Sequence, residues 1–343
     1  MIDYISVLFN FKHPRIPAGH LISVAPDGQV DWDTAKAMNI SGSHESSIRI
    51  RSMGELDQDG DATQLFVTGN PAKFLQGHNI FGSDELIPML TEVMRRICFS
   101  LDMPQMTNAA IESGTVSRID FTKSIQFENK LEVQAYIGQI ALQAKSRSGR
   151  PIAQGWTVAF QARSRRWSLV VYSKGDELNA HKIPESLPVE LLQNEADRLA
   201  RVELRLKTLE LKKLEKRVVS DFSQEILHSL YEDYIERIEM STEISIPSEE
   251  LMSLPRAIRD TYLMWRENAD VRVHMSKATY YRHRAALSRM GIDITIPFVK
   301  EATATVIPIK KVLTGRPYTT PEWAEKEGLI FKPKAKRILQ LCT

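Results

Sequence analysis

Two acidic side chains stand in strand-like segments where they could bind a metal ion. Asp120 lies in Thr115–Thr122 and Glu203 lies in Arg201–Lys207. Because successive side chains of a strand point to opposite faces, each carboxylate shares a face with other charged residues. Carboxylates from two strands supply the oxygen ligands that Mg²⁺ or Mn²⁺ prefers. The same carboxylates could instead pair with the arginines on their own strand face, which are Arg118, Arg201 and Arg205.

A tyrosine and a lysine occur in a third segment, Arg166–Lys174. If this segment is a strand, Tyr172 and Lys174 share one face, and the other face carries Trp167, Leu169 and Val171. A nearby ammonium group favours the phenolate form of tyrosine, so Tyr172 is a candidate nucleophile. A lone tyrosine is also a common core or rim residue, and the spacing by itself leaves both interpretations open.

His78, in the loop Phe74–Gly82, is a candidate third metal ligand, although a loop histidine often only hydrogen-bonds locally. The eight histidines include no pair spaced by two residues, and the two cysteines match no zinc spacing. The chain also lacks the Gly-rich phosphate loop, HExxH and GxSxG motifs. Nucleotide hydrolysis, zinc proteolysis and serine hydrolysis therefore lack their usual signatures.

The net charge of +2 conceals two basic stretches without any acidic residue. The stretch 133–175 contains Lys145, Arg147, Arg150, Arg163, Arg165, Arg166 and Lys174. The stretch 271–292 contains Arg272, Lys277, Arg282, Arg284 and Arg289. Such segregation favours contact with a polyanion such as DNA, because lysine and arginine displace the counterions of phosphates. Solvated surface is the alternative for either stretch alone.

Composition places the chain among ordinary globular proteins, with 343 residues of which 43% are hydrophobic. No run approaches the roughly 18 apolar residues of a membrane span, and the first residues do not resemble a secretory signal. We therefore expect no membrane partner. Two cysteines do not form a disulfide framework, which favours a reducing compartment.

The order of strand-like and helix-like segments around the candidate residues predicts an α+β fold. Strand-like runs up to about residue 180 are interrupted by the amphipathic helices Ser83–Ser100 and Asn129–Lys145. Arg201–Lys207 alternates strictly, although a continuous helix competes there. From about Asp221 the chain reads as helical. We predict an antiparallel-sheet domain over residues 1–240, followed by a small helical domain over residues 241–343 that binds DNA or is accessory.

Three C-terminal helices are expected, over Ser223–Tyr234, Ser248–Glu267 and Ser276–Met290. The third begins at a capping serine. We expect Ala278, Tyr281 and Ala285, with Leu287 or Ser288 as a further member, near one face of this helix, and Thr279, Tyr280 and His283 exposed. With its basic residues, including Lys277, Arg282 and Arg284, this helix suits phosphate contact or groove entry. A solvated packing helix is the alternative.

Several segments resemble the filamentous-phage gene II replication initiators, in the same order and at similar distances over about residues 70–295. The longest is NPAKFLQGHNIFGSDEL, residues 70–86. It is followed by SRID at 117–120, LVVYSK at 169–174, RVELRLK at 201–207 and MSKATYYRHR at 275–284. The first string is long enough to be specific, whereas the Tyr-x-Lys and Arg-x-Glu fragments are individually weak.

This resemblance implies rolling-circle initiation. Such proteins nick the plus strand at a double-stranded origin, remain joined to the 5′ phosphate through a tyrosine, and later rejoin the displaced strand. By position, Tyr172 matches the nucleophile, Asp120 and Glu203 match acidic positions, and His78 matches the Gly-His-Asn loop. Lys174, Arg118, Arg205 and further arginines, Arg165, Arg166 and Arg201, would then contact phosphate.

From the chemistry of these residues, we expect a divalent cofactor, Mg²⁺ or Mn²⁺, on Asp120 and Glu203, with His78 as a candidate third ligand. The implied partners are single- and double-stranded phage or plasmid origin DNA, with host helicase and polymerase as further candidates. The implied compartment is the bacterial host cytoplasm. Two rivals remain at this level. One is a non-enzymatic DNA-binding regulator of replication or transcription, and the other is a metal-dependent nuclease that uses water.

Overall fold

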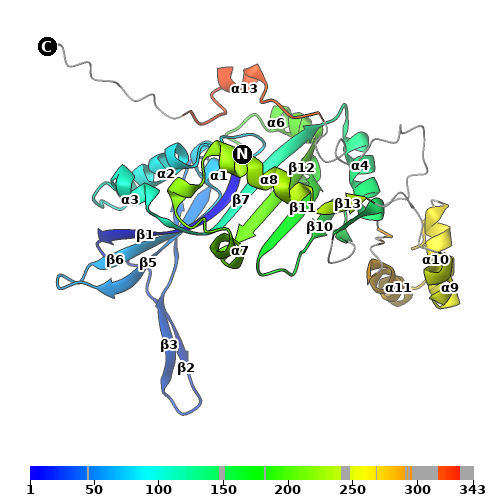
Figure 1. The fold of residues 1–343 in the computed structure, drawn as a ribbon, viewed down its shortest axis with the longest axis horizontal. Coiled ribbons are helices and arrows are strands. Elements are labelled where there is room, and N and C mark those ends of the chain that lie inside the picture. The colour runs from blue at the N-terminus through cyan, green and yellow to red at the C-terminus, as the bar shows by residue number, and fades with distance from the viewer. Residues whose placement is uncertain are drawn as a thin grey trace. The chain divides into compact units, whose positions relative to one another are not determined.

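The computed structural model describes residues 1–44, 46–146, 151–180, 183–240, 248–267, 269–289, 292, 294–295 and 316–332. Its main feature is a nine-stranded sheet with the strand order β4-β5-β6-β1-β7-β12-β11-β10-β9 (Figure 1). The α+β class predicted from the sequence is confirmed. The chain divides into two compact units, and strand β7 (Thr115–Gln126) passes from the first to the second at Asp120.

The first unit comprises residues 1–120, 211–227 and 320–343. Its strands β1 (Ile2–His13), β5 (Ser47–Leu56) and β6 (Ala62–Gly69) pair antiparallel, and β4 (Met38–Ser41) pairs with β5. A hairpin of β2 (His20–Val24) and β3 (Val30–Ala35) projects from this sheet (Figure 1). The helical elements are α1 (Pro71–Gln76), α2 (Leu86–Ser100), α3 (Asn108–Glu112), η1 (Val219–Asp221) and α13 (Glu322–Lys326).

The second unit comprises residues 121–210 and 228–319. Its strands β9 (Ile152–Gln154), β10 (Thr157–Phe160), β11 (Trp167–Ser173) and β12 (Leu199–Lys207) form an antiparallel meander. Helix α4 (Lys130–Gln143) precedes these strands in the chain, and helices α5 (Lys174–Ala180) and α6 (Val189–Ala196) lie between β11 and β12. Helices α7 (Thr208–Lys213) and α8 (Gln224–Ile235) cross the boundary between the units, and β13 (Ile238–Met240) pairs with β8 (Ala144–Ser146).

Three further helices of the second unit form a small hydrophobic core of their own. They are α9 (Ser248–Ser253), α10 (Arg256–Arg266) and α11 (Lys277–Arg289). The buried residues of this core include Tyr262, Trp265, Tyr280 and Leu287. The predicted boundary near residue 240 separates these helices from the sheet, a different division from that of the two compact units. Residues 241–247 and 290–291, the proposed linker and the end of the last helix, lie outside the described residues.

One predicted helix proves to be two. The prediction of a single helix over Ser248–Glu267 is wrong, because α9 ends at Ser253 and α10 begins at Arg256. Pro255 lies between them and caps α10 at its N-terminal end. A proline inside a helix removes one backbone hydrogen bond and clashes with the preceding turn, which explains the break.

Candidate active site on the sheet

The register of β11 against β12 places the candidate nucleophile on a charged sheet face. Tyr172 is paired with Arg201, and Val170 is paired with Glu203. Directly paired residues of an antiparallel ladder point to the same face, so Tyr172, Arg201 and Glu203 share one face. The strand alternative for Arg201–Lys207 is therefore correct, and it brings together residues that are about 30 positions apart in the sequence.

The opposite face of the same strands is apolar and fully packed. Leu169 and Val171 of β11 are buried, as are Val202 and Leu204 of β12. Trp167 lies on this face and makes an edge-to-face contact with Tyr234 of α8, with the ring centroids 4.9 Å apart. This packing holds the two strands in place. On the other face Tyr172 is 8% exposed and Glu203 is 5% exposed.

Glu203 is buried and its charge is compensated on its own strand. Arg205 Nε donates a hydrogen bond to Glu203 Oε1 at 2.5 Å, while about a third of the Arg205 side chain remains exposed. The partly exposed Arg205 guanidinium can therefore bind either the Glu203 carboxylate or an incoming phosphate.

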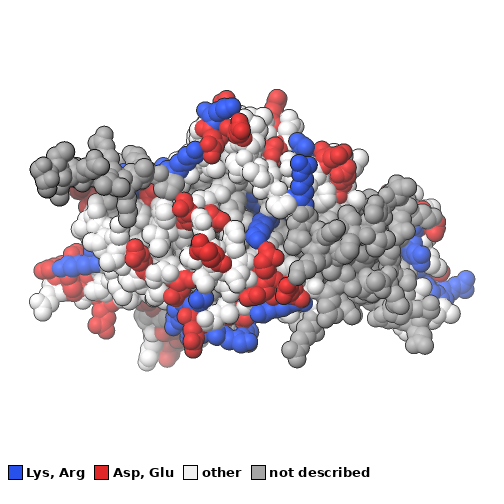
Figure 2. Space-filling view, turned by 45° about the horizontal axis from the view of Figure 1, so that its top comes forward, with Lys and Arg blue, Asp and Glu red and all other residues white. Residues whose placement is uncertain are grey.

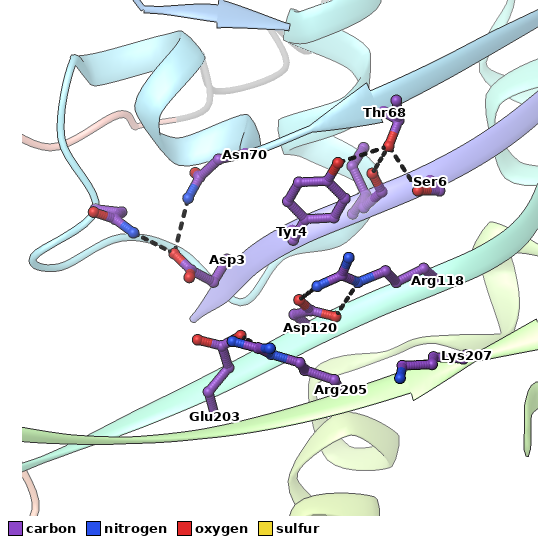
Figure 3. Close-up of polar contacts among 12 residues, drawn as sticks. Asp3, Tyr4, Ser6, Thr68, Asn70, Arg118, Asp120, Glu203, Arg205 and Lys207 are labelled. Carbon is purple, nitrogen blue, oxygen red and sulfur yellow. Dashed lines mark hydrogen bonds and ion pairs between the residues drawn. The ribbon is translucent and has the colours of Figure 1, made fainter. Parts of the chain in front are cut away.

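The first unit contains a matching carboxylate and arginine on β7. Arg118 donates two hydrogen bonds to Asp120, at 2.9 Å to Oδ1 and 2.5 Å to Oδ2, and Asp120 is only 1% exposed (Figure 3). The Arg118 guanidinium also lies 4.4 Å from the centroid of the Tyr4 ring. The bidentate pair and the aromatic contact fix Arg118 in place.

Sequence reasoning missed Asp3, which lies in β1 of the first unit. Its Oδ1 accepts hydrogen bonds from Asn70 Nδ2 at 2.9 Å and from Asn79 Nδ2 at 2.6 Å (Figure 3). Asn70 also caps α1, because its side chain accepts from the backbone N–H of Lys73. The two asparagines of the 70–86 string therefore orient a carboxylate that the string itself does not contain. The signal that could have identified it is an acidic residue within the first apolar strand.

His78 is held by structural hydrogen bonds on both ring nitrogens. Its Nε2 donates to the carbonyl oxygen of Leu329 at 2.8 Å, and its Nδ1 accepts from the backbone N–H of Ile80 at 3.3 Å. The ring is buried, with an edge-to-face contact to Phe81. These contacts join the loop to the C-terminal segment of the same unit, a role that does not require a metal.

Lys174 does not continue the strand face of Tyr172. Strand β11 ends at Ser173 and Lys174 begins helix α5, so the strand assignment of Lys174 is wrong. Its side chain is fully buried, and its Nζ donates a hydrogen bond to Glu177 Oε2 at 2.5 Å. Glu177, one helical turn further on, thus binds the ammonium group.

The other predicted phosphate contacts of the sheet differ in exposure. Arg201 is completely buried, and its Nε lies 3.4 Å from Ser124 Oγ. Arg165 is exposed. Arg166 donates from Nε to Glu210 Oε2 at 2.5 Å, and the same buried carboxylate accepts from the Tyr234 hydroxyl at 2.5 Å. Arg147 and Arg150 of the first basic stretch lie outside the described residues.

Helix α11 carries the second basic stretch, but Tyr280 and His283, which were predicted to be exposed, are buried. Tyr280, His283 and Leu287 are buried, whereas Ala278, Tyr281 and Ala285 are exposed. The buried residues follow the spacing of three and four that makes one helix stripe, and they pack against α10. His283 Nδ1 lies 2.8 Å from Thr261 Oγ1. Lys277 and Arg282 remain exposed, and Arg284 is half-buried.

Acidic and basic side chains are interspersed over the described part of the face drawn in Figure 2. Among the residues that the structure describes, no three His, Cys, Asp or Glu side chains lie together as a ready metal site. Within the same residues, no helix is long and apolar enough to span a membrane.

Comparison with known proteins identifies the family. Residues 1–225 match the family described as the N-terminal region of the phage replication-associated protein, which is the gene II protein, and residues 246–330 match its C-terminal counterpart. The chain belongs to this family of replication-associated proteins. The resemblance found from the sequence segments is therefore confirmed.

The relatives in this family are proteins of filamentous phages. The replication-associated protein of Enterobacteria phage I2-2 is 35% identical over 339 residues, which cover 96% of this chain and 98% of the relative. The replication-associated proteins of Enterobacteria phages fd and M13 are 30% identical over 122 residues, or 35% of this chain and 29% of each relative.

Proposed function

We propose that the chain initiates rolling-circle replication by nicking and rejoining one strand of origin DNA through Tyr172. The observation that carries this proposal is the shared sheet face of Tyr172, Arg201 and Glu203, in a chain of the gene II replication-associated family. A tyrosine on a rigid strand, next to a buried cation and a buried carboxylate, suits attack on a phosphate.

The proposed reaction is a transesterification. The Tyr172 hydroxyl loses its proton and its oxygen attacks the scissile phosphorus. The bond from phosphorus to the 3′ oxygen breaks, and that oxygen leaves as a hydroxyl after taking up a proton. The phosphotyrosyl linkage is itself a phosphodiester, so the number of phosphodiester bonds does not change. A 3′ hydroxyl can therefore reverse the reaction without ATP. The lack of a phosphate-binding Gly-rich loop in the sequence agrees with this scheme.

Asp120 and Glu203 are the proposed ligands of Mg²⁺ or Mn²⁺. Both offer buried carboxylate oxygens, the donors these ions prefer, and both carry a charge that an arginine now compensates. When bound, the ion would withdraw charge from the phosphate oxygens. Arg118 and Arg205, relieved of the carboxylates, would bind phosphate oxygens through their guanidinium N–H groups. His78 is not among the metal ligands, because both of its ring nitrogens make hydrogen bonds. Arg201 is completely buried, so its proposed role is to favour the Tyr172 phenolate and not to contact DNA.

The test is covalent capture of DNA by the full chain. Single-stranded oligonucleotides tiling the intergenic DNA of the genome that encodes the chain are labelled at the 3′ end and incubated with Mn²⁺. The proposal requires a labelled adduct that survives denaturation, with the label on the peptide that contains Tyr172. A cleaved fragment with a free 5′ phosphate would indicate a water-dependent nuclease. Binding without cleavage of any oligonucleotide would indicate a regulator.

A further inference from the structure

A small pocket lies at the N-terminal end of helix α11, outside the face that carries Tyr172. Its volume is about 320 Å³. Sites for small ligands begin at about 300 Å³, so this pocket has room for a single small group such as one nucleotide. Among the residues that the structure describes, the lining contains Arg272, Lys277 and Arg284 and no Asp or Glu.

The charge of the pocket favours an anion. Lys277 is the first residue of α11, a helix of 13 residues, and Ser276 Oγ accepts the backbone N–H of Thr279. The unpaired N–H groups of a helix N-terminus add partial positive charge to that of the three basic side chains. Asp270 lies near Arg272, and its Oδ1 accepts a hydrogen bond from the backbone N–H of Arg272. Asp270 does not line the pocket.

A buried tyrosine, Tyr280, lies in the wall of the pocket and is 6% exposed. The Arg272 guanidinium lies over the Tyr280 ring at 5.3 Å from the centroid, and its interaction with Tyr280 raises the pKa of Arg272. Tyr280 thus positions the Arg272 guanidinium at the pocket.

An exposed aromatic ring borders the same pocket. Tyr281 is 53% exposed, and its ring meets that of Tyr280 edge to face with the centroids 5.6 Å apart. An exposed tyrosine beside basic residues is the arrangement on which single-stranded nucleic acids stack their bases. In a duplex the bases are already stacked on one another, so they are not available to this ring.

We propose that this pocket binds one unstacked nucleotide of single-stranded DNA, with its base on Tyr281 and its phosphate on Arg272 and Lys277. The proposal rests on the proposed function in so far as the ligand is DNA, and it adds a second DNA site remote in the sequence from Tyr172. Such a site would hold the displaced strand, which a rolling-circle reaction must keep for rejoining.

The test measures binding of a fluorescent thymidine oligonucleotide to the full chain in EDTA, where cleavage is not required. Tyr281→Ala should weaken binding about tenfold, and Tyr281→Phe should not, because a phenyl ring still stacks. Arg272→Ala and Lys277→Ala should each reduce the slope of log affinity against log salt by about 0.7. Arg256→Ala is the matched control, since this exposed arginine of α10 lies outside the pocket.

The affinity for duplex DNA of the same length should not change in Tyr281→Ala. Because the proposed ligand is a strand, a free thymidine nucleotide should compete only weakly with the oligonucleotide. Single-strand binding that is unchanged in Tyr281→Ala would overturn the proposal. So would an equal loss of single-strand and duplex binding, which would indicate general phosphate contact. A chain that forms no adduct through Tyr172 but loses single-strand affinity in Tyr281→Ala would refute only the nicking mechanism.

Discussion

Tyr172 and Arg201 are cross-strand partners in the antiparallel pair β11–β12. Arg201 is completely buried, so its guanidinium is a fixed positive charge on the face that carries the tyrosine. A positive charge near a phenol favours the phenolate, which is the form that attacks phosphorus. Lys174 was the cation expected from the sequence for this purpose, but it begins the next helix and binds Glu177.

Tyr172→Phe is expected to abolish nicking and adduct formation while DNA binding persists. Loss of one hydroxyl from a strand costs on the order of 1 kcal/mol of folding stability. The measurement is relaxation of supercoiled DNA together with adduct detection on a denaturing gel. Tyr4→Phe is the matched control, a tyrosine on β1 whose hydroxyl lies 3.2 Å from Thr68 Oγ1. Adduct that is lost in Tyr4→Phe and retained in Tyr172→Phe would reassign the nucleophile.

Asp120→Asn and Glu203→Gln are each expected to reduce cleavage more than about a hundredfold, because the neutral amides bind a divalent cation poorly. These substitutions preserve side-chain shape, and circular dichroism serves as the check on folding. Cleavage by the unmodified chain should stop in EDTA and return with Mn²⁺. Full activity with excess chelator would remove the metal from the mechanism. Unaltered activity of one variant would remove that carboxylate alone.

Arg165→Ala and Arg166→Ala should separate a DNA contact from a structural ion pair. Arg166→Ala removes a donor from the buried Glu210, so stability should fall by about 1–2 kcal/mol. Arg165 is exposed, and its replacement should change stability by less than about 0.5 kcal/mol while weakening DNA binding. Urea unfolding and equilibrium binding measure the two effects. Equal stability losses in both variants would contradict this division.

The α10–α11 pair is expected to lose stability as the pH falls through the range below 6.5. Burial lowers the pKa of His283 from its ordinary value of 6.5, and Arg282 lowers it further. The unfolded chain then binds more protons than the folded chain in this range, so stability rises with pH and is lost on acidification. His283→Gln cannot titrate, and hydrogen exchange in α10 and α11 should become less dependent on pH. A pH dependence identical to that of the unmodified chain would place the titrating group elsewhere.

Arg282→Ala combined with Arg284→Ala should weaken binding to duplex origin DNA. The slope of log affinity against log salt should fall by about two, since each lost phosphate contact contributes about 0.9. Single-strand cleavage should persist, because the proposed catalytic residues all belong to the sheet. An unchanged salt slope would assign this side of α11 to packing or to protein contacts.

The sequence by itself determined the residue types and the local alternation that made Tyr172, Asp120 and Glu203 candidates. Charged residues at every second position of 201–207 specify one polar and one apolar face, provided that the segment is a strand. Only the sheet decided that it is a strand, because pairing with β11 supplies the hydrogen bonds that an isolated helix would have made internally. The order of segments that resembles the gene II initiators is also a property of the sequence alone, and it correctly predicted the family.

Tertiary structure decided which polar residues are available for chemistry. The fold brings Asn70 and Asn79 to Asp3, whose carboxylate accepts hydrogen bonds from both. It also brings Leu329, far along the chain, to His78, and the Leu329 carbonyl oxygen accepts a hydrogen bond from the ring. The buried face of α11 was likewise decided by the helix against which it packs. The sequence of α11 allows more than one face of the helix to be the buried one, and either Tyr280 or Tyr281 could lie on it. Packing against Tyr262 and Trp265 of α10 buries Tyr280 and leaves Tyr281 exposed. Local periodicity sets which residues share a face, but only the neighbouring elements determine which of the faces is buried.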